Sequence, residues 1–162
     1  MKSEKCKTIT GGGAIEVIVG LAIVLTGVFA LLKTYNHYLR FALVHKDDVR
    51  AALLVEEGIE AVKLLRDKGF ASKIATLSSE VSYGLGFVSS FWESTTTRKY
   101  IDGIFDRTFV FSDVYRGPND DISASGILDP DTKKVTVSVS YLGISGTTTK
   151  SASAYITNIF NN

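Results

Sequence analysis

The sequence predicts an α+β protein, in which a long N-terminal membrane-spanning helix packs by its C-terminal half on a small antiparallel β-sheet. Three observations predict this class. An apolar stretch near the N-terminus is long enough to cross a bilayer. The helical pattern then continues without a break. Beyond it, the chain alternates apolar and polar residues, as half-buried strands do.

The expected membrane segment covers residues 14–32, nineteen residues of which only Glu16 is charged. Nineteen helical residues rise about 28 Å, close to the hydrocarbon thickness of a bilayer. The stretch is apolar around its whole circumference, whereas a soluble core helix carries one apolar stripe. We therefore assign residues 12–33 to the membrane. Basic residues stand on both sides, so their count does not orient the segment.

The acid near the start of this segment has two interpretations. Glu16 can lie at the headgroup level, where the positive end of the helix dipole favours a carboxylate. Alternatively, its carboxylate pairs with a cation inside an assembly of such helices, since acids within membrane helices are usually functional. The position of Glu16 alone leaves both interpretations open.

The helix is expected to continue over residues 34–68 as an amphipathic segment and to stop at Gly69, because glycine commonly ends helices. No proline occurs before Pro118. Helical spacing places one apolar stripe on this segment, formed by Val44, Ala51, Leu54, Val55, Ile59, Val62 and Leu65. Charged residues take the other side, namely Glu56, Glu60, Lys63 and Asp67. In the membrane half, Thr26 and Gly27 either loosen the helix or allow close helix packing.

Residues 69–162 are predicted to form a β-rich globular part. The strand candidates are residues 108–115, 134–141 and 154–160. Residues 129–133 (DPDTK) predict a turn, because proline fixes φ and aspartates bond locally. Residues 74–92 remain open between helix, strand and loop.

Little in the chain points to catalysis, a cofactor or a metal, and we expect a protein that is not an enzyme. His37 and His45 are too few and poorly aligned for a metal site. Residues 119–121 and the pair Asp129 and Asp131 suggest calcium, but neither cluster has enough ligands, so solvated turns are expected. The formal charge is +1 with no basic run outside the N-terminus, which gives no strong nucleic-acid signal. The single cysteine, Cys6, excludes an intramolecular disulfide.

The N-terminal residues carry a family resemblance. Glu16 lies five residues after Gly11, behind a short polar leader with lysines and directly ahead of the apolar run. This spacing resembles the prepilin cleavage signature of type IV pilin-like proteins, in which a peptidase cuts after a glycine and leaves glutamate as the fifth mature residue. Residues 17–21 (VIVGL) are similar to the run that follows this glutamate in minor pilins.

The resemblance implies a leader of residues 1–11, cleavage between Gly11 and Gly12, N-methylation of Gly12, and pairing of Glu16 with an N-terminal amine during filament assembly. It implies a pilin-like fold and a structural subunit of a type IV pilus, type II secretion or DNA-uptake filament. The partners would be other pilin-like subunits, the prepilin peptidase and the lipid bilayer. The subunit would sit in the cytoplasmic (inner) membrane, N-terminus inside and C-terminal domain outside, or in a cell-surface filament.

Two features favour a minor pilin or pseudopilin over a major subunit. The first mature residue would be Gly12 rather than a bulky apolar residue, and the disulfide usual in the family is absent. The alternative to the pilin interpretation is an uncleaved single-pass membrane protein with an extracytoplasmic binding domain.

Overall fold

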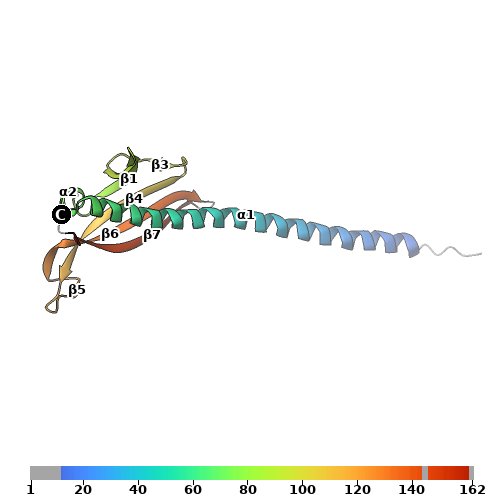
Figure 1. Ribbon diagram of the computed structural model, residues 1–162. Coiled ribbons are helices and arrows are strands. Elements are labelled where there is room, and N and C mark those ends of the chain that lie inside the picture. The colour runs from blue at the N-terminus through green and yellow to red at the C-terminus, as the bar shows by residue number, and fades with distance from the viewer. Residues whose placement is uncertain (1–11, 144–145, 161–162) are drawn as a thin grey trace, which may run out of the picture. The chain divides into compact units, whose positions relative to one another are not determined.

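The computed structural model describes residues 12–143 and 146–160 and divides into two compact units, Met1–Leu43 and Val44–Asn162. The side chain of Val44 is outside this description. An N-terminal helix is followed by a short second helix and an antiparallel sheet, so the predicted α+β class is confirmed. Figure 1 shows the elements in chain order.

Helix α1 spans Gly12–Lys68, as predicted, and Gly69 ends it with a φ of 149° that favours glycine. From Gly13 onward it is long and apolar enough to cross a membrane, judged by length and composition. The large apolar side chains between Ile15 and Leu32 are all at least 46% exposed. Thr26 donates its hydroxyl to the carbonyls of Ala22 and Ile23, and α1 continues through this position without a break. An exposed apolar surface of this extent is unfavourable in water and is stabilised by contact with other apolar groups.

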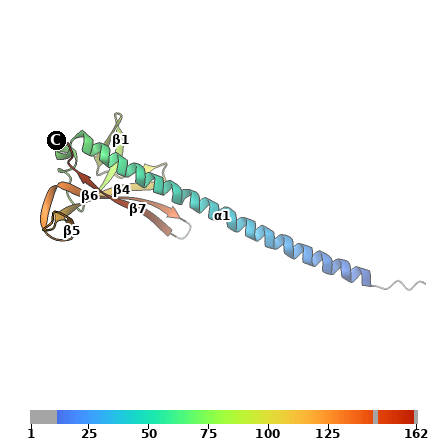
Figure 2. The ribbon, with the colours of Figure 1, turned by 60° about the horizontal axis from the view of Figure 1, so that its bottom comes forward.

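The sheet has the strand order β2-β1-β4-β6-β7, and the short strands β3 and β5 both pair with β4. All pairings are antiparallel. Helix α2 and the strands have the bounds α2 Phe70–Lys73, β1 Ser82–Val88, β2 Phe91–Thr95, β3 Tyr100–Ile101, β4 Phe105–Arg116, β5 Ile122–Ser123, β6 Ile127–Gly143 and β7 Gly146–Thr157. Figure 2 shows β4, β6 and β7 next to one another.

The C-terminal part of α1 covers one face of this sheet. The predicted apolar stripe is confirmed for the described side chains: Ala51, Val55, Val62 and Leu65 are buried, and Leu54 and Ile59 pack against them. Opposite them, alternate residues of β4 and β6 turn inward. These inward residues are Phe105, Phe109, Phe111, Val135, Val137, Val139 and Tyr141. Each buried large side chain contributes roughly 1.5–3 kcal/mol, so the seam between helix and sheet is the core of this unit.

Gly58 lets α1 approach the sheet closely. A Cβ at this position would lie 2.7 Å from Cγ1 of Val137 and 3.2 Å from Cδ of Arg107. Both distances are shorter than ordinary van der Waals contacts, which begin near 3.5 Å between carbon atoms. Gly58 is therefore required by packing, despite the cost of glycine inside a helix.

A buried arginine crosses the same seam. Arg107 on β4 is 6% exposed, and its Nη1 lies 3.3 Å from Oε2 of Glu57 on α1. Its guanidinium stacks 5.0 Å from the ring centre of Trp92, and Nη1 also reaches the carbonyl of Leu54 at 3.4 Å. These contacts bring α1, β2 and β4 together around one cation, which fixes their relative register more than it adds stability.

The turn predicted at residues 129–133 is wrong, because β6 runs through this segment without reversing. Opposite Asp113 and Val114 of β4 stand Lys133 and Asp129, so residues 130–132 have no partner on β4 and form a bulge in β6. Thr132, which is 1% exposed, still pairs with Thr157 of β7. Pro130 lacks the N–H that a regular ladder needs and therefore suits such a bulge. The expected local bonding is present, since the Asp131 N–H donates to Oδ1 of Asp129 at 3.0 Å.

Other strand and side-chain predictions are partly confirmed. The strand expected at 108–115 lies inside β4, and the one expected at 134–141 lies inside β6. The last strand begins at Gly146 and ends at Thr157, so it is longer than expected and stops before residue 158. Of the charged residues expected on the other side of α1, Lys63 pairs with Glu60 at 2.6 Å and Asp67 pairs with Arg66.

A polar cluster joins α1 to β6 and β7. Asp48 accepts hydrogen bonds from the Tyr141 hydroxyl at 2.7 Å and from the Lys150 ammonium at 2.8 Å. The bonds from Lys150 and then Tyr141 lower the pKa of Asp48 below 3.8. Burial and the neighbouring Asp48 carboxylate raise the pKa of Tyr141. The cluster therefore holds an ionised Asp48 at neutral pH.

We predict that Gly58→Ala lowers the free energy of unfolding by about 1–3 kcal/mol, because the added methyl group overpacks against Val137. Thermal unfolding followed by circular dichroism measures this change. The matched control is Gly27→Ala, at which a Cβ meets no atom within 4 Å. Equal unfolding temperatures for Gly58→Ala and the wild type would contradict the close approach.

We predict a pH-dependent gap in stability between the wild type and Asp48→Asn. Because the pKa of folded Asp48 lies below its unfolded value of about 3.8, its stabilisation is present above that pH and is lost as pH falls through the folded pKa. Urea unfolding between about pH 3 and 7 should show a constant gap above about pH 5 that shrinks below about pH 4. Asp47→Asn is the control, and a gap independent of pH would contradict the assignment.

Candidate functional site

The predicted N-terminal site falls at the start of α1. Gly11 and the leader lie outside the described residues, so the structure does not describe the cleavage junction. Gly12 is the first helical residue, and Glu16 follows one turn later with an exposed side chain between Ile15 and Val17. The free N–H groups of the first turn give this end a partial positive charge. Glu16, the one acid of the apolar stretch, therefore lies close to the positive end of the helix dipole.

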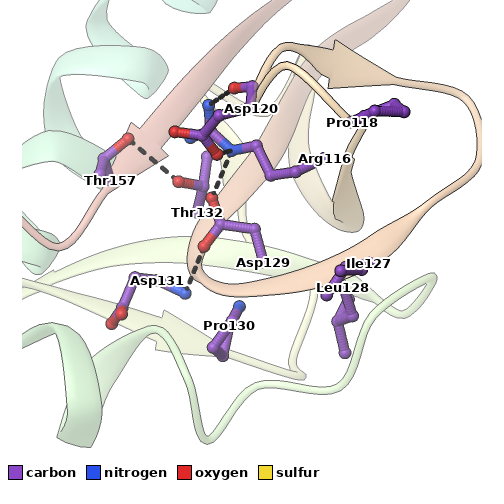
Figure 3. Close-up of a pocket in the computed structure, with 11 residues that line it drawn as sticks. Arg116, Pro118, Asp120, Ile127, Leu128, Asp129, Pro130, Asp131, Thr132 and Thr157 are labelled. Carbon is purple, nitrogen blue, oxygen red and sulfur yellow. Dashed lines mark hydrogen bonds and ion pairs between the residues drawn. The ribbon is translucent and has the colours of Figure 1, made fainter.

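A second candidate was not foreseen from the sequence. A cavity of about 590 Å³ lies where the end of β4 meets the start of β6 and the end of β7 (Figure 3). Its walls include Arg116 from β4, Asp129 and Thr132 from β6, and Thr157 from β7. The bulge of β6 at residues 130–132 lines part of this cavity.

Arg116 dominates the electrostatics of the cavity. Its Nε lies 2.9 Å from Oδ2 of Asp129, and its Nη1 donates to the carbonyl of Asp120 at 2.9 Å. Burial acts to raise the pKa of Asp129, but hydrogen bonds from Thr132 and Arg116 outweigh it, and the pKa is lowered. The Asp129 side chain, 14% exposed, therefore stays ionised against the guanidinium.

The bulge of β6 is also hydrogen-bonded to Asn158, the residue after β7. The backbone N–H of Asn158 donates to the carbonyl of Asp131 at 2.8 Å, and its Nδ2 donates to Oδ1 of Asp131 at 3.0 Å. Thr132 and Thr157 place their hydroxyl oxygens 3.4 Å apart. These bonds satisfy polar groups that a regular ladder would otherwise pair.

The structure brings the two acidic clusters of the sequence together. Asp120, Asp129 and Asp131 all border this cavity, but the cation between Asp120 and Asp129 is Arg116. Among the described residues, no group of three or more acidic, histidine or cysteine side chains is placed to hold a metal ion. A calcium ion would have to displace the guanidinium. We interpret the cluster as a network that holds the bulge.

The sequence contained only an indirect sign of this site. Arg116 and Asp129 are thirteen residues apart. The register sets Arg116 opposite Ile127 and Asp129 opposite Val114, two positions away on β4, and so brings the two side chains together diagonally. Asp and Pro residues indicated an irregularity, which proved to be a bulge rather than a reversal.

Comparisons with known proteins add no assignment. No protein-family model, curated protein or solved structure matches this chain.

We predict that Arg116→Gln lowers the free energy of unfolding by roughly 1–3 kcal/mol, because Asp129 loses its charged partner while it stays largely buried. Asp120→Asn is the control, since its side chain is 90% exposed and its carboxylate lies 3.9 Å from Arg116. Denaturant unfolding compares the two. Equal effects of both substitutions would contradict a structural role for the Arg116–Asp129 pair.

Proposed function

We propose that this chain is a type IV pilin-like structural subunit, a minor pilin or pseudopilin of a pilus, type II secretion or DNA-uptake filament. In this proposal the prepilin peptidase cuts after Gly11, the new N-terminus at Gly12 is methylated, and α1 anchors the subunit in the inner membrane. The observation that carries the proposal is the single acid, Glu16, at the required spacing from Gly11 and directly ahead of the apolar run.

The charge arrangement supports this spacing. Cleavage after Gly11 removes a polar leader and leaves an ammonium group at the membrane boundary. A carboxylate four residues along a helix lies on the same face as the N-terminal residue, one turn away. In the proposed filament it pairs with the N-terminal amine of a neighbouring helix. An acid inside a membrane helix costs about 2.5–3.5 kcal/mol at the centre on insertion scales, and less near an end, so a partner cation offsets part of that cost.

The architecture also supports the proposal. One uninterrupted helix, Gly12–Lys68, carries both the apolar segment and the stripe that forms the core with the sheet. Pilin-like proteins share a long N-terminal helix whose second half packs on an antiparallel sheet, and α1 with β4 and β6 follows this plan. In the proposed orientation, residues 1–11 are cytoplasmic and the β-rich part is outside.

We predict that the mature protein begins at Gly12 and is one methyl group heavier than the unmodified sequence. Intact mass spectrometry of protein expressed with a functional prepilin peptidase measures both features. Gly11→Ala is expected to leave the leader attached, because the peptidase requires a glycine before the cut. Gly13→Ala is the matched control and should be processed normally. An intact N-terminus in the wild type would support the uncleaved single-pass alternative instead.

We predict that Glu16→Ala still inserts in the membrane but fails to enter filaments. The lost carboxylate removes the partner of the N-terminal amine, whereas the helix becomes more apolar and inserts at least as well. Membrane fractionation and the amount of subunit in sheared filaments measure the two steps. Val17→Ala is the control, and normal incorporation of Glu16→Ala would remove the role of this acid.

A further inference from the structure

A small apolar pocket lies between the end of α1 and the β1–β2 hairpin. It measures about 360 Å³ and is lined mainly by Leu64 and Lys68 of α1 and by Phe87, Phe91 and Trp92 of the hairpin. Pockets for small ligands measure about 300–1,000 Å³, so this one suits a single side chain or a group of similar size. The structure describes all of these residues within the unit that begins at Val44.

The pocket exposes aromatic rings that contact one another without being covered. Phe87 is 60% and Phe91 53% exposed, and the Phe87 and Trp92 rings meet edge to face at 5.2 Å. The hairpin turn holds Ser89 and Ser90 at positive φ, a turn geometry that matches the twist of the two strands. The rings are thus presented by a short, defined turn, and exposed aromatic side chains in such a setting are typical of binding surfaces.

One charge at the pocket has no carboxylate partner in the part of the chain that the structure describes. The Lys68 ammonium lies 3.3 Å from the centre of the Phe91 ring, and among the described residues it pairs with no acid. Asp67, the acid that borders the pocket, is already neutralised by Arg66 at 2.7 Å. The electrostatic balance of the site is therefore positive, and it favours a ligand with a carboxylate beside an apolar group.

The strand beside the pocket offers an open edge. Within the described part of the chain, β2 pairs only with β1, so its other edge has free backbone donors and acceptors. An extended segment can add to such an edge, and alternate side chains then reach pockets on the same face. Phe91 and Trp92, the first two residues of β2, belong to both the edge and the pocket.

We propose that this hairpin binds an extended segment of a partner protein, which adds as a strand to β2 and places an apolar side chain, flanked by a carboxylate, in the pocket beside Lys68. The segment's backbone bonds to β2, its apolar side chain packs on Phe91 and Trp92, and its carboxylate pairs with the Lys68 ammonium. The proposal goes beyond filament assembly and does not depend on cleavage at Gly11, because every group in it lies between Leu64 and Trp92.

The single tryptophan of the chain gives a direct readout. We suggest titrating the full chain, reconstituted in phosphatidylcholine vesicles, with a short serine- and threonine-rich peptide that ends in phenylalanine with a free carboxylate. We expect a saturable change in Trp92 emission. The same peptide with an amidated C-terminus should bind about tenfold more weakly, the loss expected for one charged hydrogen bond.

Variants and modified probes separate the parts of the proposal. Lys68→Gln should weaken the acid peptide about as much as amidation does and leave the amide peptide unchanged. Lys73→Gln, at an exposed lysine outside the pocket, is the matched control and should bind like the wild type. Methylation of the peptide backbone nitrogens should abolish binding, because strand pairing needs their N–H groups.

Three results would overturn the proposal. The first is no saturable change in Trp92 emission, and the second is equal affinity for the acid and amide peptides. The third is phenylacetate binding as tightly as the peptide, which would assign the pocket to a free small molecule. The comparison of the acid and amidated peptides uses only the wild-type protein, so a folding defect in Lys68→Gln does not weaken the test.

Discussion

The packing of one helical stripe on one face of the sheet is the constraint on which the rest of the C-terminal unit depends. The inward phenylalanines of β4 and the valines of β6 are fully buried in the cluster that α1 forms with them between Ala51 and Leu65. Phe70 of α2 and Ile74 belong to the same buried cluster and complete it beside the sheet. Neither layer is a stable surface alone, since an isolated helix or sheet face would leave this apolar area in water. Gly58 permits the short distance between the layers.

Charged contacts lie along the same seam and set its register. At one end, Asp48 bonds Tyr141 and Lys150; in the middle, Glu57 pairs with the buried Arg107. At the other end, Lys68 lies over the ring of Phe91. Apolar packing tolerates sliding of one layer over the other, whereas these directional contacts each favour a single alignment. The pairs therefore supply specificity, and the apolar stripe supplies most of the stability.

The sequence was informative where periodicity is strong. The bounds of α1, the stripe from Ala51 to Leu65 and the alternation of residues 134–141 all follow from patterns of apolar residues. Strand β1 could not be predicted, because Gly84 and Gly86 interrupt its apolar pattern, and β2, its partner in the hairpin, was missed with it. Gly84 is instead set by the close approach of the two strands, since a Cβ there would lie 3.2 Å from Cγ2 of Thr95. The segment around Pro130 was misassigned as a turn, since the bonds that keep it in β6 come from Arg116 and Asn158, distant in sequence.

The candidate sites divide in the same way. Glu16 could be singled out because one acid in an apolar stretch is a local signal. The Arg116–Asp129 cavity and the pocket at Lys68 depend on strand register and on the hairpin approaching the end of α1, which local patterns do not encode. Tertiary packing decides which side chains from distant parts of the sequence meet. From its local sequence alone, a single charged or aromatic residue is usually assigned to the solvent-exposed surface.

The central structural claim is that the last part of α1 and the sheet form one cooperative unit. Hydrogen exchange of the full chain in vesicles tests it directly, because amides that open only by global unfolding share one free energy of exchange. The amides of residues 51–65 in α1 and those of the inner strands β4 and β6 are predicted to exchange with the same free energy, the highest in residues 44–160. Fast exchange in residues 51–65 while β4 and β6 remain protected would contradict the account.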